Sequence, residues 1–240
     1  LPDITIIKPI FYEGALQFFA INRAHHGDVG GIEPGSYSPK ATELFHEGIR
    51  IPPVRLYRNN EPILDVVEMI RINTRMPDEF WVDIKAMVAS CRVAERRIHE
   101  LLEKYGIETT RETIEEIHQY AERRMRLEIE KLPDGTYIGE SYLDSDGFQE
   151  EPILIRVAIT VDGDEAHVDF EGSDPQVTGF VNSPMANTAT CAYVSFLTTV
   201  TTPDIPHNEG AYRPIRITAP KGSVVNPEFP AAVASCTLDT

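Results

Sequence analysis

Residues 4–23 read ITIIKPIFYEGALQFFAINR, and this stretch decides the fold at the start of the chain. It contains two β-rich runs, Ile4–Ile10 and Ala15–Arg23, and a short glycine-containing segment, Tyr12–Gly14, lies between them. Runs of β-branched and aromatic residues around such a segment are typical of a hairpin with a tight turn. The sequence therefore predicts an antiparallel β-hairpin over these residues.

The length of the turn decides which side chains meet at the open end of this hairpin. A three-residue turn places Asp3 opposite His25, within cross-strand reach. A two-residue turn pairs Asp3 with Ala24 instead and directs His25 to the other face of the sheet, unless the strand ends or bulges there. The sequence is compatible with both registers.

The hairpin leads directly into residues 23–36, RAHHGDVGGIEPGS, where polar groups and glycines are concentrated. The candidate metal site consists of Asp3, His25, His26 and Asp28. A carboxylate and one or two neutral imidazoles suit Zn, Mn or Fe, with water on the remaining positions. The alternative is a strand end whose polar side chains bond to loop amides, with the glycines supplying the turns. Spacing alone leaves both interpretations open, because two or three ligands do not complete a metal site.

A helical pattern replaces the β pattern in the middle of the chain. Glycine and proline recur from Gly27 to Asn60, which indicates a long structured loop with at most a short helical turn near residues 41–46. Between residues 62 and 132, apolar residues recur at helical spacing, and a capping-box pattern begins at Thr109. The sequence predicts an antiparallel helical hairpin joined at Gly106.

The last part of the chain returns to a β pattern. Apolar residues alternate from Ile153 to Thr160, and Asp162 and Gly163 form a strong hairpin-turn signal. Residues 184–200 carry no charge and are predicted to form a buried helix, followed by short strands at 215–218 and 224–225.

These patterns together predict an α+β fold, in which antiparallel β elements flank a long helical hairpin. Three segments are expected. Residues 1–60 form the hairpin and metal-site loop region, residues 61–133 the helical hairpin, and residues 134–240 a β-rich region with a buried helix. All three are interpreted as parts of one domain that continues beyond both ends of this sequence.

Composition excludes several classes of partner. The formal net charge of -16, from 38 acidic and 22 basic residues, repels nucleic acid and anionic lipid surfaces. The sequence contains no apolar run long enough to span a membrane. Cys91, Cys191 and Cys236 are odd in number and widely spaced, which favours a reducing compartment and a cytoplasmic protein. No GxxxxGK[ST], GxGxxG or GxSxG motif occurs, so any use of ATP requires a partner.

Six blocks spread over nearly the whole chain resemble, in order, blocks of the hydantoinase B / 5-oxoprolinase family. They are LPDITIIKPIF, NRAHHGDVGGIEPGS, ATELFHEGIRIPPVRLY, YAERRMR, DFEGSDPQVTGFVNSP and PDIPHNEGAYRPIRITAPKGSVVNP. This family includes subunits of ATP-dependent N-methylhydantoinases, 5-oxoprolinases, caprolactamase, and the acetone and acetophenone carboxylases. Near the end, the chain reads SCTLDT, with Asp239 at a position where the family tends to have glutamate.

The resemblance implies a divalent metal, Mn, Zn or Fe, held by a histidine, an aspartate and a second histidine. Asp3 and His25 fit the second and third places, and the first histidine is expected immediately before Leu1. The resemblance also implies a partner subunit of the hydantoinase A type, which binds ATP and phosphorylates the carbonyl oxygen of a cyclic amide.

In the expected reaction, a metal-activated water then attacks the amide carbon. We interpret His26 or Asp28 as residues that orient this water or the metal ligands, and Arg50 as a residue that neutralises phosphate. The alternatives are an ATP-dependent ketone carboxylase subunit of the acetone or acetophenone type, and a non-catalytic scaffold that only binds its partner.

Overall fold

The structure is a computed structural model that describes residues 2–200 and 205–235. It contains two compact units, Leu1–Thr110 and Arg111–Thr240. Helices and antiparallel strands are both abundant, and a long helical region is flanked by the strands, so the predicted α+β class is confirmed. Cys236 and Asp239 lie outside the described residues. Within the described ranges, no helix combines the length and the hydrophobicity that a membrane span needs.

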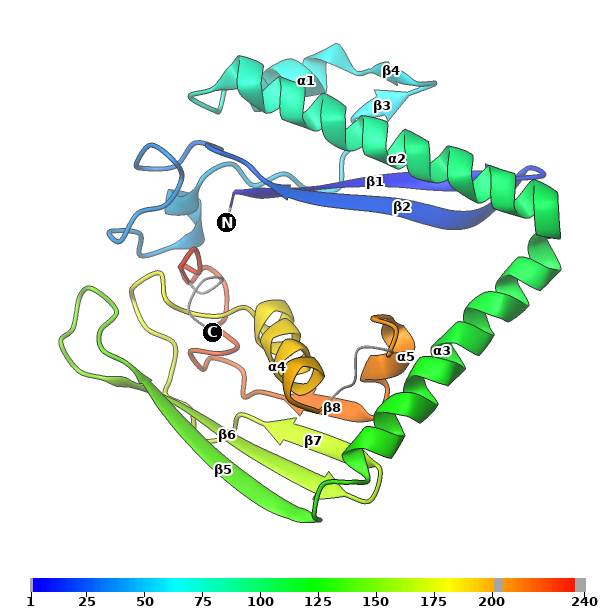
Figure 1. Cartoon of the computed structure of the whole chain (residues 1–240). Helices are drawn as coiled ribbons and strands as arrows, with labels where there is room; N and C mark the ends of the chain where they lie inside the picture. Colours follow the sequence, from blue (N-terminus) through cyan, green and yellow to red (C-terminus); the bar gives the residue numbers. More distant parts are fainter. Residues whose placement is uncertain (1, 201–204, 236–240) are drawn as a thin grey trace. The chain divides into compact units, whose positions relative to one another are not determined.

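The first unit begins with the predicted hairpin, formed by β1 (Asp3–Tyr12) and β2 (Ala15–His25) (Figure 1). Its turn has two residues, Glu13 and Gly14, with φ values of 50° and 79°. Two successive positive φ values are the geometry of the turn that best matches the twist of antiparallel strands. The tight turn is therefore confirmed.

A bulge corrects the register of this hairpin. Next to the turn, Phe11 lies opposite Leu16, but the pairing shifts between Ile10 and Phe11, and Gln17 is the additional residue on β2. Beyond the shift, Asp3 lies opposite His25. A β-bulge inserts one additional residue into one strand and so moves the alternation by one position. The hairpin thus combines the two-residue turn with the pairing that a three-residue turn would give.

The helix α2 (Pro77–Tyr105) packs on one face of the hairpin, and Figure 1 shows it running along both strands. It begins with a proline, whose missing N–H has no partner to lose there, and ends at Gly106 with φ 79°. Its buried residues recur at helical spacing and meet the inward-facing residues of the strands. The contact is formed by Phe80, Ile84, Met87, Val88 and Cys91 of α2 and by Ile4, Ile6, Ile10 and Ala20 of the hairpin.

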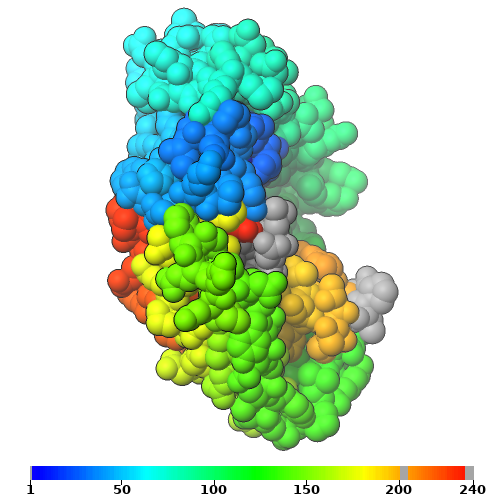
Figure 2. Space-filling model, turned by 90° about the vertical axis from the view of Figure 1, so that its left-hand side faces the viewer, coloured from blue at the N-terminus to red at the C-terminus, as the bar shows by residue number. Residues whose placement is uncertain are grey.

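Loops and short elements connect the hairpin to α2. The 3-10 helix η1 (Leu44–Glu47) confirms the short helical turn, and β3 (Tyr57–Arg58), β4 (Glu61–Pro62) and α1 (Leu64–Arg71) follow. In Figure 2 the segment after β2, in lighter blue, forms part of the molecular surface.

The second unit is built on a four-stranded sheet in the order β5-β6-β7-β8. Its elements are α3 (Ile107–Ile129), β5 (Gly135–Leu143), β6 (Ile153–Asp162), β7 (Glu165–Asp169), α4 (Met185–Val200), α5 (Glu209–Tyr212) and β8 (Ile215–Thr218). The predicted hairpin at Gly163 and the predicted uncharged helix are confirmed as β6–β7 and α4. The strand predicted at 224–225 is wrong, because these valines lie in a buried turn between Ser223 and Asn226.

Part of the apolar stripe of each long helix is buried within its own unit. Ala121, Met125 and Ile129 of α3 pack in one cluster with α4 and with the inner face of the sheet. The stripe of α2 packs on the β1–β2 hairpin. Helical periodicity identified the buried part of each stripe, but the stripes extend too far, because Leu101 and Tyr105 of α2 and Ile114 and Ile117 of α3 are exposed. Periodicity also carries no information about which element each stripe contacts.

Candidate functional site

Asp3 and His25 meet at the open end of the β1–β2 hairpin. They are direct cross-strand partners, and His25 Nδ1 lies 2.9 Å from Asp3 Oδ1. The His26 amide donates to the carbonyl oxygen of Pro2 at 2.8 Å and continues the ladder one residue further. The structure therefore brings together the two side chains that the sequence placed in the metal motif.

Arg23 is a third member of this group, and the sequence analysis did not identify it. It lies two residues before His25 on β2 and so projects from the same face. Its Nη2 and Nε donate to Asp3 Oδ2 at 2.7 and 3.1 Å. One carboxylate oxygen is therefore held by Arg23 while the other faces His25. The signal available in the sequence was the period of two along the strand.

The pair fits two positions of a metal centre. Catalytic sites for zinc and similar ions use three protein ligands and leave one position open to water. Among the described residues, no group of three His, Cys, Asp or Glu side chains could hold a metal ion. Asp3 and His25 supply a carboxylate oxygen and an imidazole nitrogen, which are ligand types that Zn, Mn and Fe accept. A third protein ligand is not among the described residues.

His26 projects to the opposite face of the strand, where α2 covers it. Its side chain is 1% exposed, and its ring lies 4.9 Å from the ring of Phe80. Neither ring nitrogen has a hydrogen-bond partner in the described part of the chain, although Asp83 Oδ2 lies 3.8 Å from Nδ1. Burial lowers the pKa of His26, against the opposing charges of Asp83 and Asp3. The imidazole is therefore neutral at pH 7 and anchors the end of β2 on α2.

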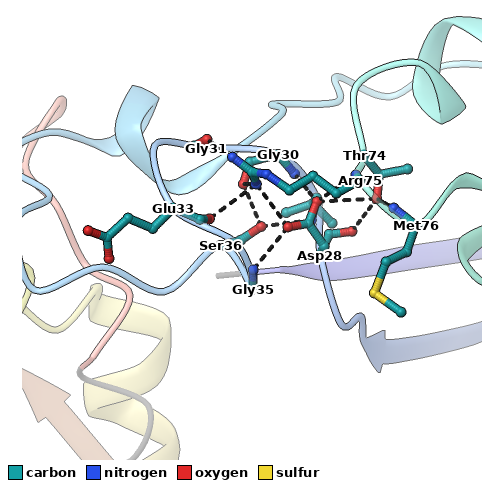
Figure 3. A network of polar contacts seen from close by, with 10 residues as sticks. Asp28, Gly30, Gly31, Glu33, Gly35, Ser36, Thr74, Arg75 and Met76 are labelled. Carbon is teal, nitrogen blue, oxygen red and sulfur yellow. Dashed lines mark hydrogen bonds and ion pairs between the residues drawn. The ribbon is translucent and has the colours of Figure 1, made fainter.

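Asp28 is buried, and its carboxylate organises the loop after β2 (Figure 3). Oδ1 accepts hydrogen bonds from the amides of Gly30 at 3.0 Å and Arg75 at 2.9 Å, and Oδ2 accepts from the amide of Gly35 at 3.0 Å. Burial opposes ionisation, but these bonds and the Arg75 guanidinium outweigh it and lower the pKa of Asp28 to about 2. This carboxylate is fully ionised at neutral pH and is engaged by the protein itself.

The Arg75 side chain closes this loop from the other side. Its Nη1 donates to Asp28 Oδ2 at 2.9 Å and to the carbonyl oxygens of Glu33 at 3.1 Å and Gly30 at 3.3 Å. Its Nη2 donates to the carbonyl oxygen of Gly31 at 2.8 Å (Figure 3). Arg75 comes from the segment between α1 and α2, far from the loop in sequence. No motif in the sequence indicated this contact.

The adjacent glycines of the loop are required by its backbone. Gly30 and Gly31 both have φ 88°. A Cβ atom would lie 2.6 Å from the carbonyl oxygen of Asn73 at Gly30, and 2.6 Å from that of His46 at Gly31. The two interpretations of this stretch therefore apply to different residues. Asp3 and His25 converge as metal ligands would, whereas Asp28 and the glycines build a turn.

Arg50 lies in the segment after η1. Its guanidinium carbon is 5.3 Å from the centre of the Phe45 ring, which is a cation–π distance. Its proposed role toward phosphate stays a prediction.

A cavity of about 970 Å³ runs beside β1 in the first unit. Its walls come from β1, from the segment Ile49–Asn60 and from α2, and Asp3 is among the lining residues. Most of the lining is apolar, with Trp81 and Ile84 on the helix side and Arg92 among its polar groups. The volume lies within the usual range for small-molecule sites in proteins.

Comparison with known proteins identifies the family. The sequence model of the family described as Hydantoinase B/oxoprolinase matches residues 1–240. The chain belongs to the hydantoinase B/oxoprolinase family. The resemblance inferred from the six sequence blocks is thus confirmed.

The relatives include components of multi-subunit enzymes. The beta subunit of caprolactamase from Pseudomonas jessenii is 36% identical over 98% of this chain and 40% of its own length. The crystal structure of the ATP-dependent caprolactamase from the same organism superposes with a TM-score of 0.92, over 98% of this chain and 41% of the caprolactamase chain. The B component of a putative D-/L-hydantoinase from Pseudomonas sp. (strain NS671) is 36% identical over 96% of this chain and 41% of its own length.

The same group of relatives includes part of a carboxylase. The delta subunit of acetophenone carboxylase from Aromatoleum aromaticum is 29% identical over 99% of this chain and 35% of its own length. The chain spans about 40% of the length of the caprolactamase and hydantoinase relatives.

Proposed function

We propose that this chain is part of one subunit of an ATP-dependent cyclic amide hydrolase, in which Asp3 and His25 hold a divalent metal, Mn, Zn or Fe. The observation that carries the proposal is the cross-strand pairing of these two side chains at 2.9 Å. The caprolactamase and hydantoinase relatives support cyclic amides as the substrate class. We place the protein in the cytoplasm, in a hetero-oligomer with a subunit of the hydantoinase A type.

ATP is bound by the partner subunit, which phosphorylates the amide oxygen and so makes the carbon electrophilic. When bound, the metal supplies Lewis acidity and lowers the pKa of water to near neutrality. Water adds its oxygen to the activated carbon, and the ring C–N bond breaks as the nitrogen takes a proton, which leaves an acyl phosphate. A second water hydrolyses the acyl phosphate to the carboxylate and releases phosphate. Small cyclic amides such as hydantoins, oxoproline and lactams are the expected substrates.

Each candidate site residue has a role in this proposal. Asp3 and His25 hold the ion, and Arg23 fixes the carboxylate so that Oδ1 remains available. His26 and Asp28 orient the ligands by anchoring the end of β2 on both sides. Arg50 neutralises the phosphate of the activated amide.

The test uses the full-length subunit together with its partner subunit. The wild-type complex is expected to contain about one metal ion per site and to open a hydantoin, 5-oxoproline or a lactam with ATP. Asp3→Ala and His25→Ala are expected to lose both the metal and the turnover, while the complex still assembles. If both variants keep metal content and turnover, the polypeptide is a scaffold and the proposal fails.

The second candidate is ATP-dependent ketone carboxylation, which the acetophenone carboxylase relative supports. Here an activated enol attacks carboxy-phosphate or CO₂, and water is not the nucleophile. Assays with acetone or acetophenone, with and without bicarbonate, separate the two reactions. Ring opening that does not depend on bicarbonate excludes the carboxylase, and bicarbonate-dependent ATP hydrolysis with a ketone excludes the hydrolase.

A further inference from the structure

We propose that Arg75 is a positioning residue for the Asp3–His25 pair. It acts through Asp28 and through the carbonyl groups of the loop at the end of β2. This inference rests on the proposed function, because it assigns Arg75 a role in holding the geometry of that metal site. It adds a residue to the site that neither the sequence motif nor the pair itself indicates.

The first argument is the number of acceptors that converge on one guanidinium. The side chain of Arg75 donates to a carboxylate oxygen and to three backbone carbonyl oxygens, at 2.8–3.3 Å. Only the planar guanidinium presents enough donors in a fixed fork for this set, since a lysine ammonium is a compact point charge with three donors. Four acceptors spread over the two terminal nitrogens of one planar group therefore favour an arginine at this position.

The second argument is the path from Arg75 to the metal ligands. Asp28 lies three residues after His25, and its carboxylate bonds to the backbone and the side chain of Arg75. Thr74 Oγ1 also donates to the Asp28 carbonyl oxygen at 2.8 Å. The hydrogen bonds from the segment between α1 and α2 thus hold the chain directly after β2. The last backbone hydrogen bond of the hairpin, from the His26 amide to the Pro2 carbonyl oxygen, lies between these contacts and the Asp3–His25 pair.

The third argument is that His25 is not fixed by burial. Its side chain is 68% exposed, whereas the neighbouring His26 ring is 1% exposed and packs on Phe80. An exposed ligand on the last residue of a strand depends on its backbone for its direction, because strand ends fray when nothing holds them. The packing of His26 on Phe80 and the hydrogen bonds between Asp28 and Arg75 hold this part of the backbone in place.

The experiment compares Arg75→Ala, Arg75→Lys and Asp28→Asn with the wild type in the full-length subunit with its partner. Lys40→Ala is the matched control, because it removes an exposed ion pair to Glu33 in the same loop without touching Asp28. Three quantities are measured: hydrogen exchange of the His26 amide, the dissociation constant for Mn²⁺ or Zn²⁺, and the recovery of both when millimolar guanidinium is added to Arg75→Ala. Circular dichroism confirms that each variant is folded.

Arg75→Ala and Arg75→Lys are expected to exchange the His26 amide faster and to bind the metal about tenfold or more weakly, as outer-shell substitutions commonly do. Guanidinium is expected to restore part of the affinity in Arg75→Ala only, and Lys40→Ala is expected to match the wild type. Unchanged exchange at His26 in both Arg75 variants overturns the inference. Faster exchange with an unchanged dissociation constant also overturns it, because Arg75 then stabilises the loop without positioning the pair.

Failure of the proposed function gives a different result. In that case the wild-type protein binds no metal at Asp3 and His25. The ¹⁵N NMR signal of His25 Nδ1, which reports its hydrogen bond to Asp3, then decides the positioning role. A change of this signal in Arg75→Ala, but not in Lys40→Ala, supports the inference. The same signal in all variants refutes it.

Discussion

Asp28→Asn is expected to remove a pH-dependent part of the stability of the first unit. The pKa of Asp28 is lowered from 3.8 to about 2 in the folded protein. A carboxyl group whose folded pKa is depressed contributes stability above its unfolded pKa and loses it as pH falls toward the folded pKa. The wild type therefore loses the contribution of Asp28 between about pH 5 and pH 2.

The size of this contribution follows from the shift. A difference of about 1.8 pKa units corresponds to about 2.4 kcal/mol at neutral pH. Of this, about 1 kcal/mol is lost by pH 3 and about 2 kcal/mol by pH 2. The Asp28 side chain is only 2% exposed, so solvent screening reduces these values little.

Urea unfolding at several pH values measures the effect. The sequence contains one tryptophan, Trp81, which lies on α2 and packs, partly buried, against the core of the first unit, so its fluorescence reports that unit. The difference in the free energy of unfolding between wild type and Asp28→Asn is expected to shrink by about 1 kcal/mol between pH 5 and pH 3. Other carboxylates titrate in both proteins and cancel. A difference that stays constant over this range refutes the assignment of a stabilising, ionised Asp28.

Three further substitutions test other parts of the first unit. Arg23→Ala is expected to weaken metal binding about tenfold, as titration calorimetry will measure. The same substitution is expected to change the free energy of urea unfolding by less than about 1 kcal/mol. An unchanged metal affinity contradicts the role of Arg23 on Asp3. Gly31→Ala is expected to lower the free energy of unfolding by about 1–3 kcal/mol, because the new Cβ would lie 2.6 Å from the His46 carbonyl oxygen. An unaffected melting temperature argues against this loop geometry. Glu13→Asn is expected to raise the melting temperature slightly, because asparagine accepts positive φ better than glutamate, and a lower melting temperature speaks against the two-residue turn.

Much of the first unit could be predicted from its sequence, because local patterns determine it. The two β-rich runs on either side of Tyr12–Gly14 predicted the hairpin, and the family resemblance implied that Asp3 and His25 converge. The sequence left two registers open, and the observed pairing combines a two-residue turn with a bulge at Gln17, which no local pattern reveals.

The contacts that sequence reasoning missed are long-range. Arg75 lies far from the loop it holds, and its four acceptors include three backbone carbonyls, which leave no mark in side-chain patterns. Asp28 belongs to the same motif as His25, yet its carboxylate is used by the turn. The composition of a motif predicts which chemical groups gather, but packing of other segments decides which of them face the site.

The bulge and the two-residue turn together set the register of the β1–β2 hairpin. Protein engineers who transplant this hairpin must carry residues 11–17 as one module, because that stretch sets the phase of every later side chain on β2. Moving the additional residue from Gln17 into the turn would keep Asp3 opposite His25, whereas regular pairing of Gln17 behind the same two-residue turn would place Ala24 opposite Asp3 and direct His25 to the other face.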